Sequence, residues 1–259
     1  MSEATWKTSI TEIKPNEVRL RGYRIDELMG QVSFGQAVYL ALKGELPNSE
    51  VGNLMDAILV CSIDHGASPP SALAARTAAS TGAPLNAAVA AGLLSINRYH
   101  GGAIEDCMRV LETGIDRARE TRTELSEIAG NLVQEYRVAK KRIAGLGHRI
   151  HTEDPRTRKL FALADETGVA DRGVEMIRAI RDELAAGGKE LPINVDGAIA
   201  ALLIDMEMPR AIANAFFMMA RVPGLVAQVY EEQSRERPMR RIHPTDHTYD
   251  GPSARSLEE

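Results

Sequence analysis

One stretch of the chain leads cationic residues directly into a glycine turn: Lys140-Lys141-Arg142-Ile143-Ala144-Gly145-Leu146-Gly147-His148-Arg149, followed by Asp154-Pro155-Arg156. Glycine lacks a Cβ, so the Gly-x-Gly pair allows the backbone to pass close to a ligand. Arginine offers a planar fork of donors for carboxylate or phosphate, and histidine titrates near neutral pH. The stretch predicts anion binding next to proton transfer, although a solvated loop between two helices could carry the same residues.

The composition around this stretch favours an all-α protein. Of the 259 residues, 44% are hydrophobic but only 4% are aromatic, and alanine is abundant. Ala, Leu and Met favour helices, whereas strands are usually denser in Val, Ile and aromatic residues. The length predicts one large domain or two lobes.

End signals and helical spacing divide most of the chain into helices. Ser33 is a suitable N-cap and Gly44 a suitable stop for one helix, Ser49 could cap the next, and Asp154 could cap a helix that Pro155 begins. After a hairpin or extended arm and a short helix, we expect helices over residues 34–43, 51–62, 71–80, 84–99, 104–113, 114–138, 155–167, 172–186, 198–206, 209–220 and 224–235.

Charge and cysteine content narrow the class of protein. The net charge of −5 provides no global basic field that would recruit nucleic acid. Cys61 and Cys107 lie in apolar helical contexts, which is typical of reduced core residues. The N-terminus has no apolar signal core, and we expect no apolar run long enough to span a bilayer. These features predict a soluble, cytoplasmic protein.

Three histidines lie beside glycine where helices are expected to end: His65, His100 and His148. Any one of them is more often a satisfied or exposed histidine than a functional one, but three in the same local context favour a site. Asp196, between Val195 and Gly197, could be an N-cap or a carboxylate tuned as a general base. The spacing of these residues does not choose between the two roles.

Metal and dinucleotide sites are disfavoured. The candidate residues show none of the close spacings of zinc sites, and Gly145-Leu146-Gly147 neither follows an expected strand nor continues to a third glycine. We therefore expect no bound metal and no tightly bound cofactor.

Taken in order, the motifs of this chain resemble those of the citrate synthase superfamily, over nearly its whole length. The N-terminal signature is similar to residues 21–28, Ser33-Phe34 and residues 44–47. The later motifs are Asp64-His65-Gly66, His100-Gly101-Gly102-Ala103, Gly145-Leu146-Gly147-His148-Arg149, Asp154-Pro155-Arg156 and Asn194-Val195-Asp196. Each motif is weak alone, but their shared order is specific.

The resemblance implies an all-α, two-lobed, citrate synthase-like fold whose inter-lobe cleft closes on oxaloacetate and an acyl-CoA. The whole chain would be one such unit, with a large lobe at about 1–103 and 208–259 and a small lobe at about 104–207. It also implies a homodimer or higher homo-oligomer, with small-molecule substrates and no nucleic-acid or membrane partner.

Residue roles follow from the same resemblance. The implied catalytic residues are Asp196 as the base at the acetyl methyl carbon, His100 at the thioester oxygen, and His148 as the acid at the oxaloacetate carbonyl. The implied carboxylate-binding residues are His65, Arg156, Arg221 and Arg237, the last supplied across a dimer interface. The coenzyme A thioester, a substrate, would contact Arg142, Ile143, Ala144, Gly145, Leu146, Gly147 and Arg149.

Departures from citrate synthases point to particular relatives. Only residues 47–64 join the Leu-Pro motif to the Asp-His motif, where synthases carry a longer helical segment. Gly66 stands where synthases usually have Glu, and Ser62 where they often have His. The short form is similar to citryl-CoA lyases and to the citrate-synthase-like module of ATP-citrate lyase, although that module tends to lose the histidine at His100.

The leading hypothesis is thus a citryl-CoA lyase that cleaves citryl-CoA to acetyl-CoA and oxaloacetate. The alternatives are a short citrate synthase, which runs the same carbon–carbon step in the other direction, and a non-catalytic CoA-binding partner subunit. The acyl-CoA chain length, the stereochemistry and the physiological direction stay open at this level.

Overall fold

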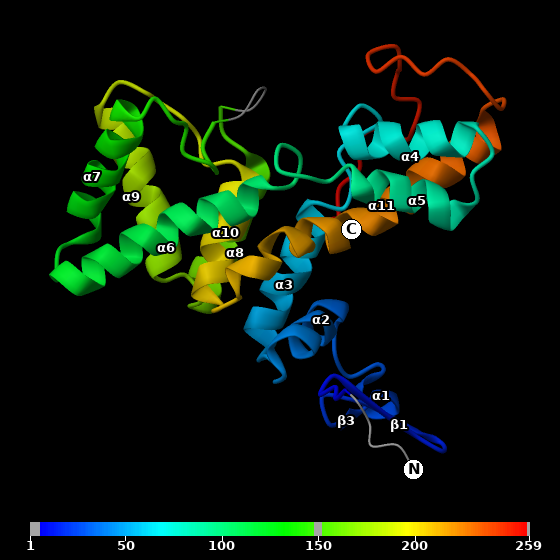
Figure 1. Cartoon of the computed structure of the whole chain (residues 1–259), viewed down its shortest axis with the longest axis horizontal. Helices are drawn as coiled ribbons and strands as arrows, with labels where there is room; N and C mark the ends of the chain where they lie inside the picture. The colour runs from blue at the N-terminus through cyan, green and yellow to red at the C-terminus, as the bar shows by residue number, and fades with distance from the viewer. Residues whose placement is uncertain (1–5, 148–151, 258–259) are drawn as a thin grey trace. The chain divides into compact units, whose positions relative to one another are not determined.

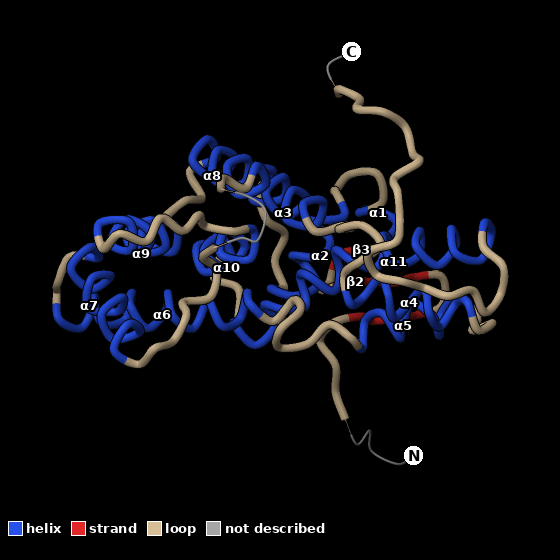
Figure 2. The backbone as a smooth tube through the Cα atoms, turned by 90° about the horizontal axis from the view of Figure 1, so that it is seen from above, coloured by secondary structure: helices blue, strands red, loops and turns tan. Residues whose placement is uncertain are grey.

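The computed structural model describes residues 6–147 and 152–257, and these residues are mostly helical (Figures 1 and 2). The all-α class is therefore confirmed. In chain order the helices are α1 (Ile25–Leu28), α2 (Phe34–Lys43), α3 (Ser49–Cys61), α4 (Pro70–Ser80), α5 (Leu85–Leu94), α6 (Ala103–Thr121), α7 (Leu125–Val138), α8 (Pro155–Thr167), α9 (Arg172–Ala186), α10 (Val195–Asp205), the 3-10 helix η1 (Arg210–Ile212) and α11 (Ala213–Arg235).

The N-terminal arm is a hairpin rather than an extended segment. Strands β1 (Thr11–Lys14), β2 (Glu17–Leu20) and β3 (Tyr23–Arg24) form an antiparallel sheet in that order. Asn16 makes the first turn with a φ of 62°, in the left-handed region that Asn tolerates.

End signals in the sequence mark several of the helix boundaries. Ser33 forms a full capping box with Gln36, and Gly44 ends α2 in the left-handed conformation. Asp154 caps α8, as predicted. The predicted cap at Ser49 is wrong, because the side chain of Asn48 accepts the hydrogen bond from the Val51 amide and Ser49 is already the first residue of α3.

Two other predicted boundaries are wrong. Helix α5 ends at Leu94 rather than at residue 99, and residues 97 and 100 then pair across a short turn. Helix α6 continues to Thr121, where a left-handed Arg122 ends it.

The chain forms two compact units, one of residues 1–62 and 101–220 and the other of residues 63–100 and 221–259. In the first unit, α10 packs against α6, α8 and α9 (Figure 1). Every residue from 197 to 203 is buried. A helix that is apolar all round is expected in the interior, and α10 occupies that place.

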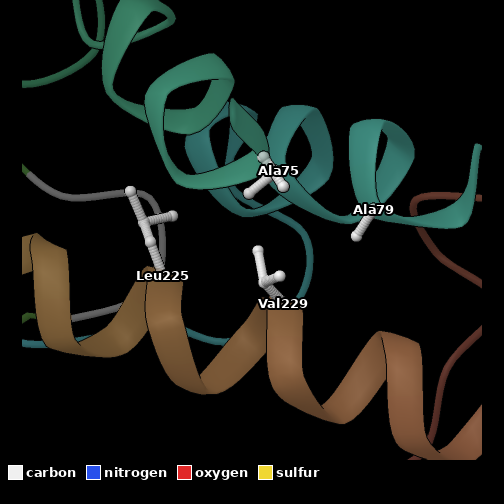
Figure 3. Close-up of a cluster of buried hydrophobic side chains, with 5 residues drawn as sticks. Ala75, Ala79, Leu225 and Val229 are labelled. Atoms are coloured by element: carbon white, nitrogen blue, oxygen red, sulfur yellow. The ribbon is translucent and has the colours of Figure 1, made fainter. Parts of the chain in front are cut away.

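The second unit is built from α4, α5 and the C-terminal part of α11. Its core joins Ala75 and Ala79 of α4 to Leu225 and Val229 of α11, together with Ala88 of α5 (Figure 3). Small alanine side chains allow the helices to approach closely, so large aromatic residues are not needed there.

Helix α11 runs without a break through Pro223, so the two helices predicted over 209–220 and 224–235 are wrong. Pro223 removes one backbone donor from the helix, but the residues on both sides remain helical. At Gly224 an added Cβ would clash with the carbonyl oxygen of Ile63, which explains a glycine inside a helix.

The prediction that no apolar run could span a bilayer is also corrected. Within the described residues, the helical stretch Arg210–Arg235 is long and apolar enough for a span by length and composition alone. Its apolar residues include Phe216, Leu225 and Val229, which are buried in the protein core. Core packing therefore accounts for part of this composition.

Candidate active site

Asp196 lies in the first turn of α10, and it is not the N-cap. The cap is Asn194, whose side-chain oxygen accepts a hydrogen bond from the Gly197 amide at 3.1 Å. Asp196 is half-buried at the positive end of the helix dipole, which favours a carboxylate. Asn194 therefore caps α10, and the Asp196 carboxylate is not used as the cap. The other role considered for Asp196, that of a general base, is compatible with this geometry.

The glycine turn is attached to the segment that starts α10. Leu146 pairs with Ile193, the Gly147 amide donates to the Pro192 carbonyl at 2.7 Å, and the Asn194 amide donates to the Gly145 carbonyl at 3.0 Å. The side-chain nitrogen of Asn194 also donates to the Gly147 carbonyl at 2.9 Å. Two motifs almost 50 residues apart in sequence therefore form one local structure.

Gly145 is a glycine because of this packing. Its φ is +86°, and an added Cβ would lie 2.5 Å from the Cys107 sulfur and 2.8 Å from the Gly197 Cα. The backbone of Gly145 therefore passes close to α10. The sequence predicted an approach to a ligand from this pair of glycines, but at Gly145 the neighbour is the protein itself.

Arg156 forms a bidentate pair with Asp154, with Nε–Oδ1 at 3.0 Å and an Nη2–Oδ2 distance of 2.8 Å. The Asp154 side chain is fully buried. Burial alone would lower the pKa of Arg156, but the hydrogen-bonded carboxylate of Asp154 and the charge of Asp196 hold that pKa above its ordinary value. The pair with Asp154 fixes the guanidinium and uses only part of its five donors.

Cys61 is a half-buried thiol in the same electrostatic group. Burial raises its pKa, Ser62 and Arg156 oppose this, and the charges of Asp196 and Asp154 add to it. Cys107 is fully buried, and burial and Asp196 both raise its pKa. Both cysteines are free. A raised pKa keeps both residues as thiols, so they line the surroundings of Asp196 without adding charge.

In the second unit, His100 is held by a buried serine. Its Nε2 lies 2.9 Å from the Ser71 hydroxyl, and its backbone pairs with Asn97 in both directions. Burial lowers the pKa of His100, and the charges of Arg221 and His65 lower it further. At neutral pH the imidazole is therefore neutral, a form that can donate one hydrogen bond and accept another. His65, His100 and Arg221 are thus brought into one electrostatic group.

A buried polar network supports the loop that carries His65. Asp64 accepts hydrogen bonds from the Gly66 amide and from the Gln228 side chain at 3.2 Å. Gln228 in turn accepts from Arg76 at 2.6 Å, and Arg76 donates to Glu232 at 2.9 Å. Glu232 also binds Arg240 in the C-terminal segment.

The predicted site residues divide between the two units. Asp196, Arg156 and residues 142–147 belong to the first unit, and His65, His100, Arg221 and Arg237 belong to the second. Arg221 is buried, and Arg237 is exposed just after α11. The predictions at His148 and Arg149 lie outside the described residues.

Sequence reasoning gave no role to Ser71, Asn194, Gln228 or Arg76. Asn194 was visible as part of the Asn-Val-Asp motif, and Ser71 follows Pro70 at the start of α4. Gln228 and Arg76 are 152 residues apart, so their contact left no local signal. The described residues contain no group of three or more His, Cys, Asp or Glu suited to a metal ion.

Comparison with known proteins gives one family. Residues 48–244 match the family described as citrate synthase, C-terminal domain. The structure of citryl-CoA lyase from Hydrogenobacter thermophilus has 42% sequence identity and a TM-score of 0.84, and the match covers 98% of each chain.

More distant matches agree on the fold. Citrate synthase of Haloferax volcanii is 31% identical over 204 residues, which is 77% of this chain and 51% of that protein. ATP citrate lyase of Methanothrix soehngenii, solved with citrate and coenzyme A, is 23% identical with a TM-score of 0.80, over 98% of this chain and 43% of that one. The chain therefore spans about half or less of the length of these two proteins. The resemblance that the motifs indicated, including its short form, is confirmed.

Proposed function

Since the chain belongs to the citrate synthase family, we propose that it is a citryl-CoA lyase that cleaves citryl-CoA to acetyl-CoA and oxaloacetate. One observation carries the proposal. The match to a citryl-CoA lyase covers 98% of both chains, whereas citrate synthase of Haloferax volcanii is about twice as long as the part of it that matches. The coenzyme A thioester is the substrate, and we propose no tightly bound cofactor.

In the proposed reaction His148 takes the proton of the citryl hydroxyl as the carbon–carbon bond breaks. The hydroxyl carbon becomes the ketone of oxaloacetate, and the bonding electrons pass to the acetyl unit, which departs as the enolate of the thioester. His100 donates a hydrogen bond to the thioester oxygen, and Asp196 delivers a proton to the methylene carbon, which gives the methyl group of acetyl-CoA. An acid and a base on opposite sides of the breaking bond fit this step.

The neutral state of His100 supports its part. A neutral imidazole can donate a hydrogen bond to an enolate oxygen, and Ser71 at its Nε2 fixes the orientation of the ring. The first turn of α10 supports the part of Asp196, because the helix dipole stabilises its carboxylate after the proton has left.

The other predicted site residues would bind the carboxylates and the coenzyme A part of the substrate. We propose that His65, Arg156, Arg221 and Arg237 hold the carboxylates, since Arg presents a bidentate fork to such groups. The pairing of Arg156 with Asp154 supports this role by fixing the direction of its remaining donors. Residues 142–147 and Arg149 would contact coenzyme A, and Lys140, Lys141 or Arg142 would lie near its phosphates.

The arrangement of the whole protein is part of the proposal. We propose a large lobe at about 1–103 and 208–259, a small lobe at about 104–207, and the reaction in the cleft between them. We also propose a cytoplasmic homodimer or higher homo-oligomer in which Arg237 completes the site of the partner subunit. A monomer with full activity at nanomolar concentration would contradict this last point.

The test mixes the pure protein with citryl-CoA and follows the products. A lyase gives acetyl-CoA and oxaloacetate in equal amounts, and oxaloacetate is measured by its reduction with malate dehydrogenase and NADH. Free citrate and coenzyme A with little oxaloacetate would support the citrate synthase alternative, which the family match also favours. Citryl-CoA bound but unchanged would support the non-catalytic CoA-binding subunit.

A further inference from the structure

The side chain of Asn194 joins the glycine turn to the start of α10 through both ends of its amide. Its oxygen accepts from the Gly197 amide at 3.1 Å, and its nitrogen donates to the Gly147 carbonyl at 2.9 Å. The backbone amide of the same residue donates to the Gly145 carbonyl at 3.0 Å. The side chain is half-buried, so these bonds are partly shielded from competing water.

Each bond fixes a different part of the candidate site. The bond to Gly197 caps α10 and thereby sets the first turn, where Asp196 lies. The bond to Gly147 holds the end of the segment proposed to contact coenzyme A, directly before His148 in sequence. A carboxamide carries an acceptor and a donor on one carbon atom, which Asp, Ser and Thr do not offer in this geometry.

We propose that Asn194 is a positioning residue that sets the coenzyme A-binding loop at residues 142–147 against the turn that carries Asp196. The inference rests on the proposed function, because it assigns a consequence to the proposed roles of that loop and of Asp196. The two hydrogen bonds have separable effects. The cap governs the placement of Asp196 and hence kcat, and the bond to Gly147 governs the placement of the loop and hence the KM for the thioester.

Replacement of Asn194 by Ser separates the two bonds. Serine is a good N-cap, so it keeps an acceptor for the start of α10, but it has no amide to donate to Gly147. In Asn194→Ser we expect the KM for citryl-CoA to rise about 5- to 10-fold, the loss of about one hydrogen bond, with kcat within about 2-fold of the wild type. Hydrogen exchange of the backbone over residues 142–147 should become faster.

Asn48 provides the matched control. It caps α3 in the same way, accepting from the Val51 amide at 2.9 Å. Asn48→Ser should leave KM, kcat and exchange over residues 142–147 unchanged, so any general effect of an Asn-to-Ser change at a cap is measured in the same protein. Asn194→Asp is the second variant, because it also retains a cap acceptor and lacks the donor.

The experiment distinguishes a failure of the Asn194 proposal from a failure of the proposed lyase function. Wild-type protein that releases no oxaloacetate from citryl-CoA contradicts the proposed function, and the Kd for coenzyme A alone then replaces KM as the readout for Asn194. An unchanged KM or Kd in Asn194→Ser, with exchange over residues 142–147 as slow as in the wild type, overturns the inference. Failure of both Asn194 variants to fold, with Asn48→Ser folded, also overturns it, because Asn194 would then be needed for folding rather than for positioning.

Discussion

Gly145 and Gly197 lie backbone against backbone: a Cβ added to Gly145 would be 2.8 Å from the Cα of Gly197, and one added to Gly197 would clash with the carbonyl oxygen of Gly145. The glycine turn and the first turn of α10 are therefore in direct contact without any side chain between them. This contact places the residues that lead to His148 next to the helix turn that carries Asp196.

The contact predicts that Gly145→Ala is costly for stability. Two effects add, because alanine is strained at a φ of +86° and its methyl group would overlap Cys107 and Gly197. We expect a loss of about 3 kcal/mol in the free energy of unfolding, measured by urea denaturation. Gly188→Ala is the control, since Gly188 has a φ of +78° and open space around its Cα. It should show only the backbone strain, about 1 kcal/mol. Equal losses in the two variants would contradict the close contact.

Asp196→Asn tests the proton transfer at the methylene carbon. The amide has nearly the same shape but cannot deliver the proton, so we expect kcat for oxaloacetate release to fall about 100- to 10,000-fold. Coenzyme A should still bind, as measured by calorimetry. Asp182→Asn, at an exposed position on α9, is the control and should keep full activity. An active Asp196→Asn protein would remove Asp196 from the mechanism.

Ser71→Ala tests the orientation of His100. Without the hydroxyl at 2.9 Å the imidazole loses a fixed partner, and we expect kcat to fall about 10-fold with a smaller change in KM. Ser80→Ala is the matched control on the same helix, because Ser80 is also buried and its hydroxyl donates to the Thr77 carbonyl of that helix. Similar losses in the two variants would mean that the effect comes from the packing of α4 and not from His100.

The lowered pKa of His100 predicts a pH dependence of stability. Burial, Arg221 and His65 all disfavour the imidazolium in the folded protein. As pH falls below the ordinary histidine pKa of about 6.5, the unfolded chain binds this proton first, so the free energy of unfolding decreases with falling pH. In His100→Gln this part of the decrease should vanish. An NMR titration of His100 with a midpoint at or above the ordinary value would contradict the prediction.

Glu232→Gln tests the buried charge network of the second unit. Burial alone would raise the pKa of Glu232, but Arg240 and Arg76 outweigh it and hold that pKa below its ordinary value. The wild type should therefore lose stability as pH falls from about 4.3 toward the lowered pKa, and the variant should lack this slope. At neutral pH the variant removes the carboxylate that pairs with Arg76 and Arg240. We expect the free energy of unfolding to fall by about 3 kcal/mol.

An exposed ion pair serves as the control for the loss of stability in Glu232→Gln. Glu135 binds Arg117 at the surface, and Glu135→Gln should cost less than about 1 kcal/mol. The free energies of unfolding of both variants come from the same urea titrations. If the two losses were similar, the network from Asp64 to Arg240 would contribute no more than a surface pair.

Much of the fold could be predicted from local signals. Ser33 and Gly44 bound α2, and Asp154 with Pro155 begins α8, because capping depends on residues within one turn of the helix end. Helix α11 was predicted as two helices because Pro223 and Gly224 are local breakers, and a local rule contains nothing about the surrounding core. The close approach of Ile63 to Gly224 shows why the glycine is there.

The sequence by itself determined the all-α class and the order of the motifs, because these follow from residue type and spacing. It also supplied the set of candidate groups, in which the carboxylate-binding arginines came from the family resemblance. Only the tertiary structure decided which groups meet. Asn194, and not Asp196, caps α10. The hydroxyl of Ser71 is the hydrogen-bond partner of His100. The backbone of Gly145 packs against that of Gly197. Such contacts join residues tens of positions apart, where the distance in space is fixed by how helices pack and not by any pattern along the chain.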